Sequence, residues 1–206
     1  VLFRSLQDPL AELVKIEPQN IGVGQYQHDL NKKRLTEVLD GVVEDSVNSV
    51  GVDLNTASYS LLEHVSGISK SVAKNIVLYR EENGAFTSRA QLKKVKRLGP
   101  SAFVQCAGFM RIADGKNPLD NTGVHPESYD VCKKMIEMLG YTIKDIEDKN
   151  IADIDDRVKK IGLKEISKQL EIGEPTLRDI ILEIKKPGRD PRDEGMKPIL
   201  RTDVLK

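Results

Sequence analysis

Apolar side chains recur at intervals of three and four along most of the chain, the spacing that places them on one face of an α-helix. The longest such stretch runs from about residue 28 to 49, with acidic residues between the apolar positions. It predicts one long amphipathic helix whose acids face solvent. Shorter stretches with the same spacing follow as far as residue 184, separated by breaks that contain glycine or proline. The pattern therefore predicts an all-α fold.

Helix boundaries are well marked between residues 52 and 113. Small polar residues favour the position before a helix because their side chains accept hydrogen bonds from its first amides, whereas glycine favours the end of a helix. Four short helices are predicted on these grounds. Their boundary residues are Asn55 and Ser69 as caps of the first and second helices, Gly84 as the end of the second, Ser88 with Gln91 as a capping box for the third, and Pro100 in the first turn of the fourth.

A short turn pattern that joins an apolar residue to glycine occurs twice in this region. It reads SGIS at residues 66–69 and RLGP at residues 97–100, about 31 residues further on. Such a turn between two short amphipathic helices is typical of a helix-hairpin-helix, in which glycine supplies a backbone angle that other residues resist. We expect the two copies to pack as a pseudo-symmetric pair.

The predicted chemistry of these turns is anion binding by backbone amides. The first N–H groups of a helix lack intrahelical partners and carry partial positive charge, so they hold a phosphate without reading sequence. Ser69 stands where a second glycine is usual, and Pro100 removes one donor, so we expect weaker binding than at a Gly-apolar-Gly turn. It stays open whether one turn is purely structural. The candidate residues are Gly67, Ile68, Ser69, Lys70 and Lys74 at the first turn, and Lys96, Arg97, Leu98, Gly99 and Ser101 at the second.

Charge is concentrated around the two turns. The whole chain is formally neutral, but residues 65–111 hold nine lysines and arginines against two glutamates, a balance of +7. A basic block in a neutral protein is a candidate electrostatic footprint for nucleic acid. The alternative interpretation is an ordinary helical bundle with a solvated basic face.

The run DLNTASYSLLEHVSGISKSVAKNIVLYREENGAFTSRAQLKKVKRLGPSAFVQCAGFMRI resembles the tandem helix-hairpin-helix domain of the bacterial Tex family of transcription accessory proteins. Flanking runs are similar to the same family in the same order, LQDPLAELVKIEPQNIGVGQYQHDLN before it and DGKNPLDNTGVHPESYDVCKKM and KKPGRDPRDEGMKPILRTDVL after it. The resemblance extends from about Leu6 to the C-terminus and implies a nucleic-acid-binding role in transcription.

The resemblance also implies a domain organisation. Residues 1–16 correspond to the last helix of an RNase H-like domain whose body is absent, residues 17–51 to a long connecting helix, and residues 52–113 to the tandem hairpin domain. Residues 114–186 correspond to a second helical, hairpin-like domain, and residues 187–206 to a linker before an absent S1 domain. Within this scheme residues 114–124 are interpreted as a linker without apolar anchors, so residues 28–113 are expected to fold alone.

Catalysis has little support in the sequence. The three histidines lack metal-ligand spacing, so we predict no metal, cofactor or catalytic residues. Base-excision glycosylases also use a hairpin, and Asp120 lies 21 residues after Gly99, near the position of their catalytic acid. However, no lysine nucleophile is suitably placed, and aromatic residues for a base pocket are few in a chain without tryptophan.

The predicted partner is DNA or RNA, bound through the phosphate backbone without sequence preference. The alternative is a protein-interaction scaffold that contacts RNA polymerase or another transcription protein without binding nucleic acid directly. No apolar run is long enough to span a bilayer, and no signal peptide is evident. With only two cysteines, Cys106 and Cys132, a disulfide framework is excluded and a cytoplasmic setting is predicted.

Overall fold

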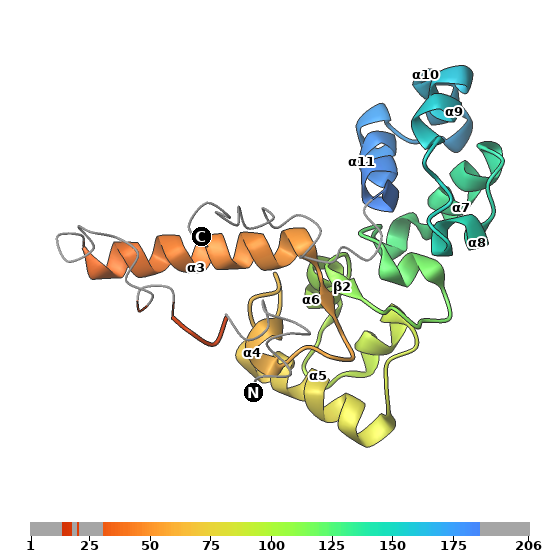
Figure 1. Cartoon of the computed structure of the whole chain (residues 1–206). Helices are drawn as coiled ribbons and strands as arrows, with labels where there is room; N and C mark the ends of the chain where they lie inside the picture. Colours follow the sequence, from red (N-terminus) through yellow and green to blue (C-terminus); the bar gives the residue numbers. More distant parts are fainter. Residues whose placement is uncertain (1–13, 18–19, 21–30, 186–206) are drawn as a thin grey trace, which may run out of the picture.

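The structure is a computed structural model that describes residues 14–17, 20 and 31–185 (Figure 1). Most of the region predicted to be the end of an RNase H-like domain, the first part of the connecting segment and the linker at 187–206 lie outside the described residues. Over the described part, the predicted all-α fold is confirmed, apart from two strands of two residues each.

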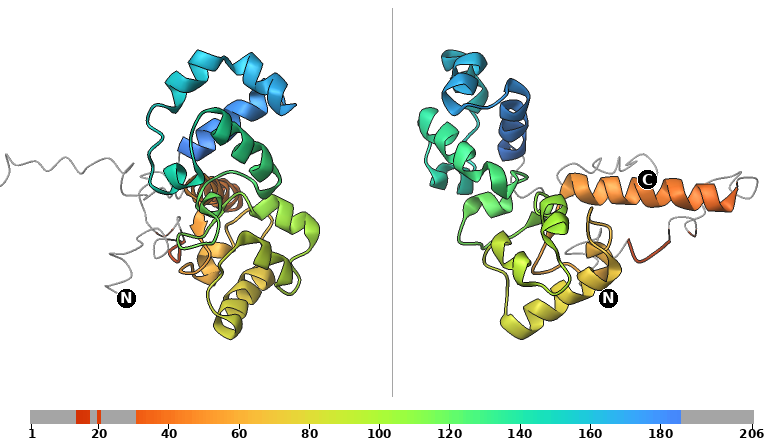
Figure 2. Two further views of the ribbon diagram at one scale, coloured as in Figure 1. Left: turned by 90° about the vertical axis from the view of Figure 1, so that its right-hand side faces the viewer. Right: turned by 180° about the vertical axis from the view of Figure 1, so that it is seen from behind.

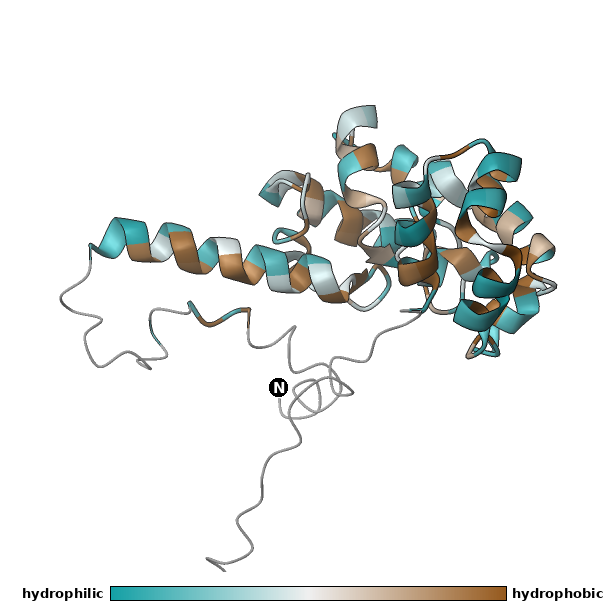
Figure 3. Cartoon of the chain, turned by 90° about the horizontal axis from the view of Figure 1, so that it is seen from above, coloured by the Kyte–Doolittle hydropathy of each residue, from teal (hydrophilic) through white to brown (hydrophobic). Residues whose placement is uncertain are grey.

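Helix α3, Lys32–Val50, confirms the long amphipathic helix. Asn31 caps it by accepting a hydrogen bond from Arg34 N at 3.3 Å, and its acids are exposed as predicted. Its apolar stripe, however, is largely uncovered: Val38 and Val42 are 57% and 56% exposed. Among the described residues, α3 packs on the core through Val43 and Val47 near its C-terminal end, and the rest of the helix projects from the body (Figure 3). No helix among the described residues is long and apolar enough to cross a membrane.

The hairpin domain consists of four short helices around one core. They are α4 (Tyr59–Leu62), α5 (Lys70–Asn83), the 3₁₀ helix η3 (Arg89–Lys94) and α6 (Pro100–Cys106). The strands β1 (Val52–Asp53) and β2 (Met110–Arg111) pair in parallel and join the start of the domain to its end. The core is made of apolar residues from every one of these elements.

Most of the predicted helix boundaries are confirmed, but Asn55 is not a helix cap. Ser58 caps α4 by accepting a hydrogen bond from Leu61 N at 3.3 Å. Asn55 instead pairs with a distant peptide: its Oδ1 accepts from Phe86 N at 2.7 Å, and its Nδ2 donates to Phe86 O at 3.0 Å. Local sequence favoured a cap because asparagine is common there, and it gives no signal for a partner 31 residues away.

A second helical unit with its own core follows. Its elements are η4 (Pro118–Asn121), η5 (Pro126–Ser128), α7 (Tyr129–Met138), α8 (Ile143–Glu147), α9 (Ile154–Ile161), α10 (Leu163–Leu170) and α11 (Glu174–Lys185). Buried residues from Leu119 to Ile184 form this second core. Figure 2 shows the unit stacked at one end of the hairpin domain, away from the projecting part of α3.

The interpretation of residues 114–124 as an unanchored linker is wrong. Leu119 is 0% exposed and belongs to the second core, and Val124 is buried with it. The segment is also hydrogen-bonded to the hairpin domain, since Lys116 N donates to Thr87 O at 2.9 Å and Ile112 N to Asp120 O at 3.1 Å. The turn-forming residues that suggest a linker here form η4 and its flanks instead.

Candidate nucleic-acid interface

Residues with the same role in the two hairpin turns are 30 positions apart, which corrects the predicted register. The left-handed residue of the first turn is Gly67, with φ +79°, and its counterpart in the second turn is Arg97, with φ +66°. Gly99 has an ordinary φ of −76° and is the N-cap of α6, as Ser69 is of α5. The prediction that Gly99 supplies the special backbone angle is therefore wrong, and a non-glycine residue adopts it.

An apolar side chain anchors each turn. Ile68 and Leu98 are both buried, and their amides donate to Val65 O at 3.0 Å and Val95 O at 3.2 Å. The turn thus closes with the same hydrogen bond in both copies. Because these side chains are buried, Ile68 and Leu98 can offer a phosphate only backbone groups.

Each turn packs against the second helix of the other hairpin. Asn75 of α5 donates from Nδ2 to Lys96 O at 2.8 Å. Its counterpart 30 positions later, Gln105 of α6, lies so close to Gly67 that a Cβ there would be 2.7 Å from Gln105 Cβ. These reciprocal contacts make the predicted pseudo-symmetric pair.

The start of α5 combines a capped backbone with exposed cations. Ser69 Oγ accepts a hydrogen bond from Val72 N at 3.4 Å. The amides that precede Val72 in the first turn of α5 have no acceptor within the helix, as is usual at a helix start. Lys70 and Lys74 are exposed, and Lys74 Nζ lies 5.9 Å from the centre of the Tyr59 ring. At α6 the first helical residue is Pro100, which has no N–H, so Ser101 provides the next amide.

Three of the nine basic residues in the basic block are buried or half-buried and stabilise the fold, so they are not part of the exposed surface. Arg89 and Arg111 are buried, and Arg80 is half-buried, donating to Leu54 O at 3.0 Å. Six cations of the basic block remain exposed around α5 and the second turn: Lys70, Lys74, Lys93, Lys94, Lys96 and Arg97.

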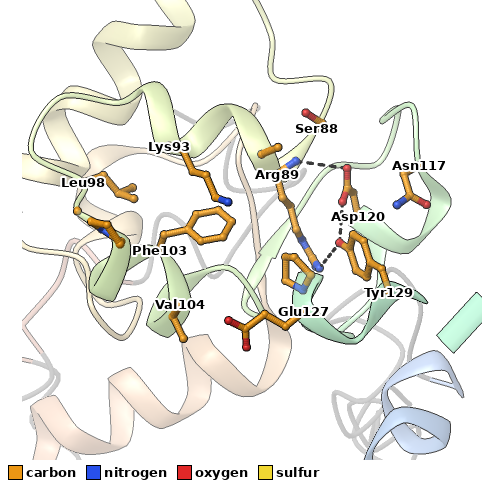
Figure 4. Close-up of a pocket in the computed structure, with 14 residues that line it drawn as sticks. Ser88, Arg89, Lys93, Leu98, Phe103, Val104, Asn117, Asp120, Glu127 and Tyr129 are labelled. Atoms are coloured by element: carbon orange, nitrogen blue, oxygen red, sulfur yellow. Dashed lines mark hydrogen bonds between the residues drawn. The ribbon is translucent and has the colours of Figure 1, made fainter. Parts of the chain in front are cut away.

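Arg89 joins the hairpin domain to the second unit. Its guanidinium donates to Met110 O at 2.7 Å, Val124 O at 2.7 Å and Tyr129 Oη at 2.8 Å, and also to Thr122 O. Asp120 completes the cluster: it accepts from Arg89 N at 3.3 Å and from Tyr129 Oη at 2.6 Å (Figure 4). The charge count of the basic block included Arg89, since nothing local in the sequence distinguishes it from the exposed cations.

Burial shapes the ionisation of this cluster. It lowers the pKa of Arg89, although Tyr129 and Asp120 act in the opposite direction. It also lowers the pKa of Arg111 to about 10, with the charge of Arg89 adding to the effect. The pKa of Tyr129 is raised, chiefly by burial, so the phenol keeps the proton that it donates to Asp120. Asp120 is thus held in a structural cluster.

The turn between α7 and α8 in the second unit repeats the same local design. Gly140 has φ +76°, Tyr141 is buried, and Thr142 caps α8. Here, however, a carboxylate of the chain already occupies the helix start: Asp145 Oδ2 accepts from Thr142 N and from Thr142 Oγ1, both at 2.7 Å. These bonds from Thr142 lower the pKa of Asp145. A fixed negative charge at this helix start disfavours a phosphate.

The fold and its repeated turns define a tandem helix-hairpin-helix protein. Residues 47–111 match the family model described as "Helix-hairpin-helix motif", and residues 117–192 match one described as "HHH domain". These matches agree with the two cores of the structure.

Curated relatives identify the family. The chain is 54% identical over 191 residues to "Transcriptional accessory protein Tex" of Neisseria gonorrhoeae, covering 93% of this chain and 24% of the relative. It is 52% identical over 193 residues to "Protein tex" of Bordetella pertussis, covering 94% and 24%. It is 38% identical over 254 residues to human "S1 RNA-binding domain-containing protein 1", covering 99% and 26%. The chain belongs to the Tex family of transcription accessory proteins and spans about a quarter of the length of these relatives.

Proposed function

We propose that this chain is a nucleic-acid-binding module of a Tex-like transcription accessory protein. In this proposal the two hairpin turns at residues 66–69 and 97–100 hold the phosphate backbone of DNA or RNA without sequence preference. The helix-hairpin-helix matches and the names of the relatives support nucleic-acid binding. The observation that carries the backbone mechanism is the set of six exposed cations on the domain that contains both turns.

The packing of the turns supports a shared binding surface. The hydrogen bond from Asn75 to Lys96 O places the second turn beside α5, so Lys74, the neighbour of Asn75, and Lys96 are on adjoining elements. Phosphates along one strand would then meet cations from both hairpins. Backbone amides and lysines provide no base readout, which is why we expect indifference to sequence.

The second unit is expected to contribute little to this binding. Asp145 occupies the α8 start, and the unit lacks a comparable concentration of positive charge. We propose that it acts as a spacer or protein-contact domain and that the module has no catalytic activity. Asp120 does not supply a catalytic acid in this proposal, because it is buried and bonded to Tyr129 and Arg89.

We expect replacement of Lys70 and Lys74 by alanine to reduce the salt dependence of binding. For B-DNA each neutralised phosphate adds about −0.9 to the slope of log K against log salt concentration, so about three to five contacts give roughly −3 to −4.5. Each substitution should make the slope shallower by about one, because each removes one phosphate contact. Fluorescence anisotropy with a labelled duplex at several salt concentrations measures the slope.

Lys133 and Lys134 provide the matched control, since they are an exposed lysine pair on α7 of the second unit. Their replacement by alanine should leave the slope nearly unchanged. An unchanged slope in the Lys70 and Lys74 variant, with an unaltered circular dichroism spectrum, would refute binding at the first turn.

The exposed apolar stripe of α3 favours a second candidate function. Val38 and Val42 are more than half exposed on a helix that projects from the body, which suits a protein-interaction scaffold in contact with RNA polymerase or another transcription protein. Such a scaffold predicts little salt-sensitive affinity for nucleic acid, so the same titration separates the two functions.

A further inference from the structure

A pocket of about 620 Å³ lies beside the second hairpin turn, where η3 and α6 meet the segment 117–129 (Figure 4). This volume is in the range of small-ligand sites. The wall on the hairpin side is apolar and consists of Leu98, Pro100, Phe103 and Val104, of which Val104 is 47% exposed. The pocket therefore offers apolar surface directly at a turn that we propose to hold a phosphate.

Polar groups are placed at the margins of the pocket. Lys93 Nζ lies over the Phe103 ring, 4.7 Å from its centre. Ser88 and Asn117 lie on the side opposite the second turn, as Figure 4 shows. Arg89, Asp120 and Tyr129 are also in the wall, but they are hydrogen-bonded to one another. Glu127 adds a carboxylate to the lining, and this carboxylate lies 3.6 Å from His125 Nδ1. An occupant would thus meet an apolar face, the ammonium group of Lys93, the carboxylate of Glu127 and a few neutral groups able to bond its edges.

We propose that this pocket takes one nucleobase from a single-stranded segment whose backbone is bound by the exposed cations beside the second turn. The inference rests on the proposed backbone binding and specifies its substrate class. A nucleobase combines an apolar face with hydrogen-bonding edges, as the pocket requires. In a duplex the bases are stacked and paired, so only a single strand presents one at low cost.

Charge complementarity favours a nucleotide over an apolar peptide side chain. Lys94, Lys96 and Arg97 are exposed on the segment between Lys93 and the pocket wall at Leu98. A polyanionic strand bound along these cations brings its bases to the pocket mouth, because Leu98, Gly99 and Pro100 belong both to the turn and to the pocket. A peptide anchored by an apolar side chain gains nothing from the cations unless it is also acidic.

The test compares two single strands with the same backbone. The whole chain is titrated by fluorescence anisotropy with a short labelled oligothymidylate and with an abasic strand of equal length. Stacking of a base on a protein surface of this kind strengthens binding, so we expect the base-bearing strand to bind about tenfold more tightly. Ala90→Trp, which fills the pocket from an exposed lining position, should remove that preference without weakening the abasic strand.

Ala85→Trp is the matched control, because Ala85 is exposed and lies outside the pocket. It should keep the tenfold preference. Val104→Trp is a second filling variant if Ala90→Trp disturbs η3, and thermal melts verify both folds. Equal affinity of the unaltered chain for the two strands, or a preference that survives both filling variants, would overturn the base pocket while leaving backbone binding intact. Absence of salt-dependent binding to either strand would instead reject the proposed function itself, and with it this inference.

Discussion

Arg89→Ala is expected to cause a large loss of stability, because it removes the side chain that joins the hairpin domain to the second unit. Arg89 is 1% exposed, and its guanidinium donates to the carbonyls of Met110, Thr122 and Val124. Its removal leaves buried carbonyl groups without donors and takes away a positive charge beside Tyr129 and Asp120. Breaking a buried ionic cluster in this way costs about 3–5 kcal/mol, a large fraction of the stability of an ordinary domain. The free energy of unfolding from urea denaturation measures the loss.

Lys94→Ala controls for the loss of a positive charge from the same helix, because Lys94 is exposed. We expect it to change the free energy of unfolding by about 0.5 kcal/mol or less. Arg89→Lys should remain clearly destabilising, because an ammonium group cannot reproduce the planar fork that reaches several carbonyls at once. A cost below about 1 kcal/mol for Arg89→Ala would show that the cluster does not hold the two units together.

The same contacts change the expectation that residues 28–113 fold alone. A chain that ends at residue 113 keeps Arg89 but lacks Thr122, Val124 and Tyr129, three of the groups that bind its guanidinium. We therefore expect this fragment to be much less stable than the whole chain or to lack a cooperative thermal transition. A fragment that ends at residue 185 is the comparison. Differential scanning calorimetry of the two fragments decides the point.

Local signals predicted most of the secondary structure and missed the long-range contacts. The periodicity around Val43 and Val47 and the preference of Ser69 and Pro100 for helix starts act over a few residues, so the helices at 32–50, 70–83 and 100–106 could be predicted. The pairing of Asn55 with Phe86 spans 31 residues and leaves no trace in local composition.

The hairpin turns could be located from the sequence, whereas the burial of the cations around them could not. Repetition of the turn and the basic block located the hairpins, because both are properties of short segments. Which cations are exposed depends on long-range packing, so the charge count of the basic block included the buried Arg89 and Arg111. The pocket beside the second turn could not be predicted for the same reason. Its walls come from residues 88–104 and 117–129, and the composition of residues 114–124 indicated a linker.

The register of the two turns leads to the second large effect, which is expected for Gly67→Ala. Gly67 has φ +79°, a conformation that costs a residue with a Cβ about 1–2 kcal/mol. The new Cβ would also be 2.7 Å from Gln105 Cβ and 3.3 Å from Ala102 O, so the turn must move away from α6. We expect a loss of at least 2 kcal/mol in the free energy of unfolding, together with weaker nucleic-acid binding.

Gly99 and Arg97 test whether this effect depends on the left-handed position and not on glycine as such. No atom lies within 4 Å of a Cβ built on Gly99, whose φ is ordinary, so Gly99→Ser should change stability by only a few tenths of a kcal/mol. Arg97→Gly should raise the free energy of unfolding by roughly 0.5–1 kcal/mol. Glycine avoids the cost of the positive φ, and this gain is larger than the entropy that a more flexible unfolded chain loses on folding. If Gly99→Ser were as costly as Gly67→Ala, the 30-residue register between the turns would be wrong. Gly99 would then supply the special backbone angle of the second turn, as its sequence motif suggests.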